Sequence, residues 1–173
     1  MLNRYDADAT FFMLGSQLKG QSALANSVVK AGNEVGVHSW SHKTMTRRSA
    51  KTNAADLKNA RSAIAKATGE TPRWFRPPGG STSAALKRTA SGVGLRQVIW
   101  TADTLDWRDH KASTIASRAL KGARPGAVIL MHDGGGDRSA TVKALPTILK
   151  TLKARGFDCV TMSELEALGY QIR

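Results

Sequence analysis

Two histidines stand four residues apart in the segment VHSWSHKTM, residues 37–45. His38 and His42 can both reach one metal ion if the segment turns back on itself or forms a helical turn. Neutral imidazole is the commonest protein ligand for zinc and related divalent ions. The alternative is a pair of solvent-facing loop histidines, because a short spacing of this kind also arises by chance.

A third histidine, His132, ends a run of apolar residues. A histidine in that position can serve as a general acid or base near neutral pH. Two carboxylates, Asp103 and Asp106, lie three residues apart, and one of them could hold and tune the imidazolium of His132. Trp107 follows directly, and a tryptophan at a rim suits the apolar C–H faces of a sugar ring. The alternatives are a structural histidine, turn or capping aspartates, and a core tryptophan.

Arg76 precedes the rigid stretch Pro77-Pro78-Gly79-Gly80. A planar guanidinium can orient a carboxylate through a fork-like pair of hydrogen bonds. An ordinary ion pair in a rigid turn is the alternative. His110 lies in a polar stretch and is expected at the surface.

The elements that must position these residues alternate between short apolar runs and longer amphipathic segments. This alternation predicts an α/β fold with parallel strands and helices outside. The run at residues 127–131 is continuously apolar, which is typical of a strand buried on both faces. Strands are expected at residues 9–14, 34–37, 73–75, 97–101, 127–131 and 157–161, and helices at residues 22–31, 51–68, 83–90, 113–121 and 142–152, with a last helix opened by Ser163 as N-cap and Glu166 three residues on.

The candidate residues all follow predicted strands directly. Active sites of parallel α/β folds lie at the carboxyl ends of their strands. Four separate segments are therefore predicted to deliver polar groups to one face, and this convergence argues for a catalytic site. No linker or repeat divides the chain, so residues 1–173 are expected to form one domain.

The composition is strongly basic, with 26 Lys and Arg against 13 Asp and Glu and a formal net charge of +13. Such a balance favours polyanionic partners such as nucleic acid, an anionic membrane or an acidic cell-wall polymer. The basic residues are spread along the chain, and no nucleic-acid-binding signature accompanies them. No window is long and apolar enough for a membrane span. A single cysteine, Cys159, excludes an intramolecular disulfide.

Four blocks occur in a fixed order: H-S-x-x-H, F-R-P-P-G-G, W-x-x-D-x-x-D-W and I-L-M-H-D. Together they resemble the polysaccharide deacetylases with the NodB homology domain, carbohydrate esterase family 4, and the resemblance covers essentially the whole chain. It implies a distorted (β/α)7-type barrel and metal-dependent removal of N- or O-acetyl groups. The implied substrates are chitin or chitooligosaccharides, peptidoglycan or acetylxylan, and the implied metal is zinc, with cobalt or another transition metal as alternatives.

The resemblance also assigns metal ligands and catalytic groups. The family binds its metal with one aspartate and two histidines, and the histidines match His38 and His42. A second aspartate is the catalytic base, which the arginine matching Arg76 orients. The histidine matching His132 is the general acid, tuned by the aspartate matching Asp106.

The expected substrate-binding residues come from two regions of the chain. Residues matching Trp107 and Leu130 line the groove and the acetyl pocket. Pro77, Pro78 and Gly79 are expected to contribute to the same binding surface.

The family's first motif, T-F-D-D-G-P, which supplies both aspartates, has no counterpart in this sequence. The family's first strand is therefore expected to be missing. One explanation is a fragment of a normal deacetylase, which would place the protein outside the cell or in its envelope. The other is a genuine short form with a re-formed site, cytoplasmic as the sequence stands. Asp6 and Asp8 are expected at the far end of the barrel, so Asp103 or Asp133 is the better substitute ligand or base.

A barrel without one strand exposes two unpaired edges. We expect these edges to be covered by a neighbouring subunit, by strand rearrangement or by the N-terminal residues. Three functions compete at this point. They are a deacetylase, intact or impaired by the lost aspartates; a non-catalytic carbohydrate- or cell-wall-binding protein; and a basic nucleic-acid-binding domain that rests on charge alone.

Overall fold

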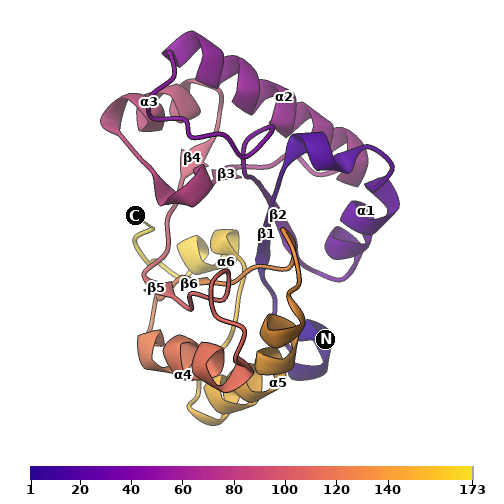
Figure 1. Cartoon of the computed structure of the whole chain (residues 1–173), viewed down its shortest axis with the longest axis vertical. Helices are drawn as coiled ribbons and strands as arrows, with labels where there is room; N and C mark the ends of the chain where they lie inside the picture. The colour runs from indigo at the N-terminus through magenta and orange to yellow at the C-terminus, as the bar shows by residue number, and fades with distance from the viewer. Residues whose placement is uncertain (173) are drawn as a thin grey trace. The chain divides into compact units, whose positions relative to one another are not determined.

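The computed structural model describes residues 1–172, which form two compact units. The first unit comprises residues 1–8, 100–160 and 168–171, and the second comprises residues 9–99 and 161–167 with Ile172. Both units combine parallel strands with helices, which confirms the α/β class expected from the sequence (Figure 1). The expectation that residues 1–173 form one domain stays a prediction.

The second unit is built on a four-stranded parallel sheet in the order β1-β2-β3-β4. In the register of β2 and β3, Val37 lies opposite Phe75, so these neighbouring strands end side by side. His38 and Arg76 are the residues that follow these two strand ends. The elements of this unit are β1 (Thr10–Met13), η2 (Gly15–Leu18), α1 (Ser22–Lys30), β2 (Glu34–Val37), α2 (Ala50–Thr68), β3 (Trp74–Phe75), η3 (Pro78–Gly80), α3 (Ala84–Gly92), β4 (Arg96–Gln97) and α6 (Met162–Ala167).

Helix α2 supplies much of the core of the second unit, and its sequence explains why it forms there. Ser49 caps its first turn by accepting a hydrogen bond from the Thr52 amide, and Gly69 ends it in the left-handed conformation. The apolar face of α2 is buried, with Leu57 and Ile64 completely inaccessible to solvent. Burial of such side chains stabilises the fold by about 1.5–3 kcal/mol each. Helix α3 packs beside α2 (Figure 1).

The first unit contains a two-stranded parallel sheet, in which Asp103 of β5 lies opposite Leu130 of β6. Its helices α4 and α5 pack against each other through a small apolar cluster that includes Ile115 and Ile148. The elements of this unit are η1 (Leu2–Tyr5), β5 (Ala102–Asp103), α4 (Ala112–Gly122), β6 (Ile129–Leu130) and α5 (Ser139–Ala154).

Three strand predictions are wrong in detail. Residues 98–101 form no strand, and the single strand expected there is replaced by β4 and β5, which pair in different sheets. The strand expected at residues 157–161 is also absent. A strand needs a paired neighbour, and between residues 157–161 and the N-terminal segment the backbone forms only the hydrogen bond from the Asp8 amide to the Cys159 carbonyl. The run at 127–131 is not buried on both faces. Only Leu130 is buried, because β6 has a single neighbouring strand.

The start of the last helix also differs from the expectation. Thr161 and Glu164 form the capping box of α6, with each side chain accepting the other residue's amide hydrogen. Ser163 lies inside the helix instead and accepts a hydrogen bond from the indole of Trp74. The predicted helix start was two residues too late, because Ser163 and Glu166 have the same three-residue spacing as Thr161 and Glu164.

Within residues 1–172, every helix is too short or too polar to cross a lipid bilayer. Strand β1 has a single neighbour, β2, and is an edge of its sheet. The N-terminal residues 2–5 form the 3-10 helix η1 and not a strand. How the exposed edges are covered stays a prediction.

Candidate functional site

His38 and His42 lie together in the loop that follows β2. Their ring centroids are 4.9 Å apart, with the ring planes at 66°. The His38 amide donates to the Met13 carbonyl (2.8 Å), and the ring Nδ1 hydrogen-bonds the Arg76 carbonyl (2.7 Å). Because a carbonyl oxygen only accepts, Nδ1 carries the hydrogen and a neutral ring keeps its lone pair on Nε2. This is a common arrangement for a metal-ligating histidine.

The two rings meet because the backbone between them turns back sharply. Ser39 and His42 both adopt the left-handed conformation, with φ values of 73° and 61°. The Ser39 hydroxyl accepts a hydrogen bond from the His42 amide at 3.0 Å. Non-glycine residues leave the usual regions at a cost and do so mostly where the surroundings enforce it. The structure therefore juxtaposes the two predicted ligands by a strained turn.

Arg76 is a buried cation beside this turn. Its guanidinium stacks 4.2 Å from the centroid of the Phe12 ring, and its Nε has no hydrogen-bond partner. Burial lowers the pKa of Arg76 to about 10, so the group is still charged at neutral pH. No carboxylate among residues 1–172 pairs with it. Its predicted carboxylate-orienting role thus has no partner in the described part of the chain.

The histidine pair fits a divalent ion as two ligands, but the described residues supply no third. No group of three His, Cys, Asp or Glu side chains in residues 1–172 is arranged to hold a metal. Asp103, suggested as a substitute ligand or base, accepts the Leu105 amide at 2.8 Å with one carboxylate oxygen, and its role stays a prediction. Asp133 is exposed, and Asp6 forms an ion pair with Lys153.

Asp106 and His132 form a second pair of interacting side chains, in the first unit. Asp106 is 2% exposed and accepts hydrogen bonds from the His132 amide (2.7 Å), the His132 Nδ1 (2.7 Å) and the Thr141 hydroxyl (3.0 Å). Burial raises the pKa of Asp106, but the hydrogen bonds and charge of His132 outweigh burial, so the net pKa lies below its usual value. A carboxylate that holds Nδ1–H leaves Nε2 to carry or release a proton.

The predicted substrate-binding residues divide into exposed and buried groups. Trp107 is 50% exposed, with the Arg108 guanidinium 5.8 Å from its ring centroid, so the core-tryptophan alternative is wrong for this residue. Leu130 is buried, and its carbonyl accepts the Thr104 hydroxyl at 2.8 Å. Pro77 and Pro78 are buried, Gly79 is exposed with φ 61°, and His110 is exposed as expected.

Sequence reasoning missed the residues that support these pairs. Asp56 accepts the Trp40 amide at 2.7 Å, and Asn53 donates to the Met45 carbonyl at 2.9 Å. Both are polar side chains on the buried face of α2, and that intrusion into an apolar helical stripe is the signal that could have revealed them. Thr141 is the equivalent intrusion in α5.

Comparison with known proteins identifies the same family over most of the chain. The sequence profile described as polysaccharide deacetylase matches residues 1–98. A peptidoglycan-N-acetylglucosamine deacetylase of Bacillus cereus is 38% identical over 167 residues, which cover 95% of this chain and 78% of that protein. A peptidoglycan-N-acetylglucosamine deacetylase of Listeria monocytogenes is 34% identical, and this chain spans 35% of its length.

Solved structures show the same likeness. A pseudoenzyme of carbohydrate esterase family 4 from Bacillus anthracis has a TM-score of 0.89 at 33% identity, covering 95% of this chain and 57% of its own. A family 4 acetyl xylan esterase from Clostridium thermocellum, in complex with a cobalt ion, has a TM-score of 0.90 at 34% identity, covering 96% and 80%. These likenesses confirm the expected fold class, the distorted (β/α)7-type barrel of that family.

Proposed function

Because the chain belongs to the polysaccharide deacetylase family, we propose that it is a metal-dependent hydrolase that removes acetyl groups from a polysaccharide. The observation that carries this proposal is the histidine pair, whose rings lie 4.9 Å apart after a strand end. Peptidoglycan is the first substrate to test, since the Bacillus cereus relative is named for its N-acetylglucosamine units. Chitooligosaccharide is the second, because a Bradyrhizobium relative is named for it, and acetylxylan is the third.

In this proposal His38 and His42 hold a divalent ion, zinc or cobalt. When bound, such an ion lowers the pKa of a coordinated water and polarises the acetyl carbonyl. The similar Clostridium thermocellum esterase forms a complex with cobalt, which supports including that metal. The hydrogen bond from His38 Nδ1 to the Arg76 carbonyl keeps the ring oriented and its other nitrogen basic.

His132 is assigned as the general acid that protonates the leaving amine from Nε2. Asp106 fixes the orientation of that imidazole through its hydrogen bond with Nδ1. Trp107 offers an exposed aromatic face to a sugar ring, and Leu130 lines the acetyl pocket. The catalytic base and the third metal ligand are assigned to no residue among 1–172.

Acetate release tests this function. The protein is incubated with zinc or cobalt and, in separate reactions, with peptidoglycan, chitooligosaccharide and acetylxylan. The proposal expects acetate from at least one substrate, abolished by chelation and by His132→Ala. No acetate with any of these metals and substrates would overturn catalysis and leave only the family membership.

The second candidate is a non-catalytic glycan-binding protein. It is favoured by the buried Arg76 without a carboxylate partner and by the two-ligand histidine pair. The likeness to a Bacillus anthracis pseudoenzyme of the same family supports it too. Co-sedimentation with peptidoglycan in the presence of chelator, without acetate release, would establish it. Co-sedimentation with peptidoglycan that is weak and requires metal would exclude the non-catalytic glycan-binding function.

The basic charge of the second unit favours nonspecific attraction to polyanions. Residues 35–99 contain twelve Lys and Arg against two acidic residues, and one of these, Asp56, is buried in an ion pair with Arg48. Charge reversal of Lys58 and Lys87, both exposed, should reduce sedimentation with anionic polymer at low salt. Reversal of Lys121 and Lys150 in the other unit is the matched control, because its net excess of basic residues is smaller.

We also propose a cell-envelope or secreted location and a homo-oligomer. The named polymer of the Bacillus cereus relative supports the location, and the single-neighbour edge strand β1 supports the oligomer. Cell fractionation tests the first. Light scattering on purified protein tests the second, and a strictly monomeric mass would contradict it.

A further inference from the structure

The histidine loop, residues 38–48, is held from the side of α2 by a buried carboxylate. Asp56 Oδ1 accepts the Trp40 amide hydrogen at 2.7 Å, and Asp56 Oδ2 pairs with Arg48 Nη1 at 2.9 Å. Its side chain is only 6% exposed, and that of Arg48 is 25% exposed. One carboxylate therefore ties two points of the loop to the same helix.

The point that Asp56 holds is the centre of the strained turn. Trp40 lies between Ser39 and His42, the two non-glycine residues of this loop that have positive φ. The Trp40 carbonyl is fixed as well, because it accepts the Ser16 amide at 2.9 Å. Both backbone groups of Trp40 are thus occupied. A strained conformation persists only where neighbouring structure over-determines it.

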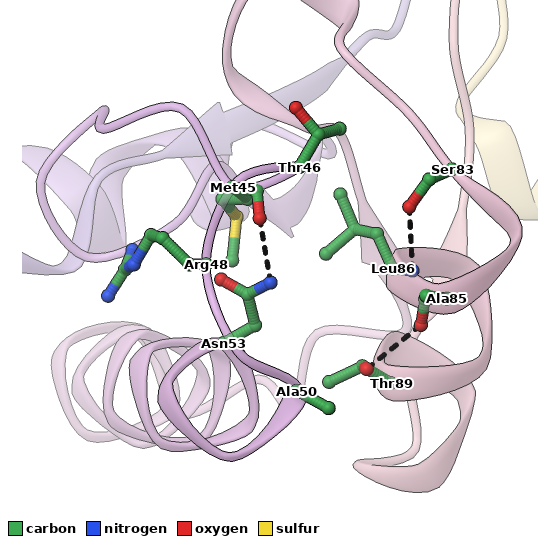
Figure 2. A pocket seen from close by; sticks show the side chains of 9 residues that line it. All are labelled: Met45, Thr46, Arg48, Ala50, Asn53, Ser83, Ala85, Leu86 and Thr89. Carbon is green, nitrogen blue, oxygen red and sulfur yellow. Dashed lines mark hydrogen bonds between the residues drawn. The ribbon is translucent and has the colours of Figure 1, made fainter.

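Asn53 fixes the far part of the same loop, one turn before Asp56 on α2. Its amide donates to the Met45 carbonyl at 2.9 Å, and Met45 itself is buried (Figure 2). Figure 2 shows Asn53 reaching from the helix toward that carbonyl. Both residues line a small pocket of about 40 Å³. Gly15 permits the close approach on the other side, since a Cβ there would lie 2.6 Å from the Trp40 ring and 2.8 Å from the Ala60 backbone.

We propose that Asp56 is a positioning residue that holds the histidine loop, with Arg48 and Asn53, in the shape that lets His38 and His42 bind one metal ion. The proposal rests on the proposed function in taking the histidines as ligands. Asp56 touches no reacting group and acts through the Trp40 amide. Loss of Asp56 should let the turn relax and the two rings separate. This separation lowers the affinity for a metal ion that both histidines must bind together.

The test uses the full chain and three substitutions in a matched series. Asp56→Ala removes both contacts, and Asp56→Asn keeps an oxygen for the Trp40 amide while losing the charge that faces Arg48. Asp109→Ala is the control, because Asp109 also accepts a backbone amide, from Lys111 at 3.1 Å, and pairs with an arginine, Arg118 at 3.0 Å, in the other unit. Zinc and cobalt affinities are measured by calorimetry, and Trp40 amide exchange by NMR without metal.

We expect Asp56→Ala to raise the Kd for both metals by about tenfold or more and to accelerate Trp40 amide exchange. Asp56→Asn should fall between it and the unmodified protein, and Asp109→Ala should change neither readout. Unchanged Trp40 exchange in Asp56→Ala, or an equal loss of metal affinity in Asp109→Ala, would overturn the proposal. If the unmodified protein binds no metal, the proposed function fails, while Trp40 exchange still decides whether Asp56 holds the turn.

Discussion

Replacement of Asp106 tests how much its hydrogen bonds to His132 and Thr141 stabilise the folded protein. In Asp106→Ala the His132 amide, the His132 Nδ1 and the Thr141 hydroxyl all lose their acceptor. Hydrogen bonds to a charged group are worth about 1.5–3 kcal/mol each. His132 is one-third exposed, so water can replace part of the loss, whereas Thr141 is buried. We therefore expect the free energy of unfolding to fall by about 3–5 kcal/mol.

The sign of the pH dependence sharpens this test. The folded pKa of Asp106 lies below its usual value, so its ionised form contributes stability above the unfolded pKa of about 3.9. That contribution is lost as pH falls from there through the lower folded pKa. We therefore expect the difference in free energy of unfolding between the wild type and Asp106→Asn, measured from urea unfolding curves, to be smaller at pH 3 than at pH 7. Asp137→Asn, an exposed control that also accepts a nearby amide, should leave the urea midpoint nearly unchanged. An equal difference in free energy of unfolding at both pH values would refute the reasoning.

Three further substitutions probe the site. Arg76→Met should raise the free energy of unfolding by about 1–2 kcal/mol, because it removes a buried, unpaired charge; a lower urea midpoint would contradict this. Gly15→Ala should lower the free energy of unfolding by about 1–3 kcal/mol, because its Cβ would overlap Trp40 and the Ala60 backbone, and thermal unfolding measures it. Trp107→Ala should leave the melting temperature unchanged, because the ring is half exposed, yet raise KM for the glycan; an unchanged KM would remove Trp107 from the binding surface.

Much of the fold was predictable because local signals and packing agree. The bounds of β2 and the helix expected at residues 51–68 follow from the residues alone, and the structure places them at Glu34–Val37 and Ala50–Thr68. The strand expected at residues 157–161 fails for a non-local reason. Its apolar residues fit a strand, but strand formation requires a paired neighbour that the local sequence does not reveal.

The site was predictable as a set of residue types but not as a geometry. Spacing indicated that His38 and His42 could share an ion if the chain turned back, and the structure shows that turn. The role of Asp56 depends on a contact between a helix residue and a loop amide sixteen positions away, which no periodicity encodes. The suggestion that Asp103 is a substitute ligand stays a prediction; its carboxylate accepts a hydrogen bond from the Leu105 amide.

Metal binding by the histidine pair is the central claim, and calorimetric titration with zinc tests it most directly. We predict that the wild-type chain binds one equivalent of zinc and that the double substitution His38→Ala and His42→Ala abolishes this binding. The same titration on His110→Ala, which removes an exposed histidine, should match the wild type. No saturable binding by the wild type, or equal binding by the double variant, would contradict the account.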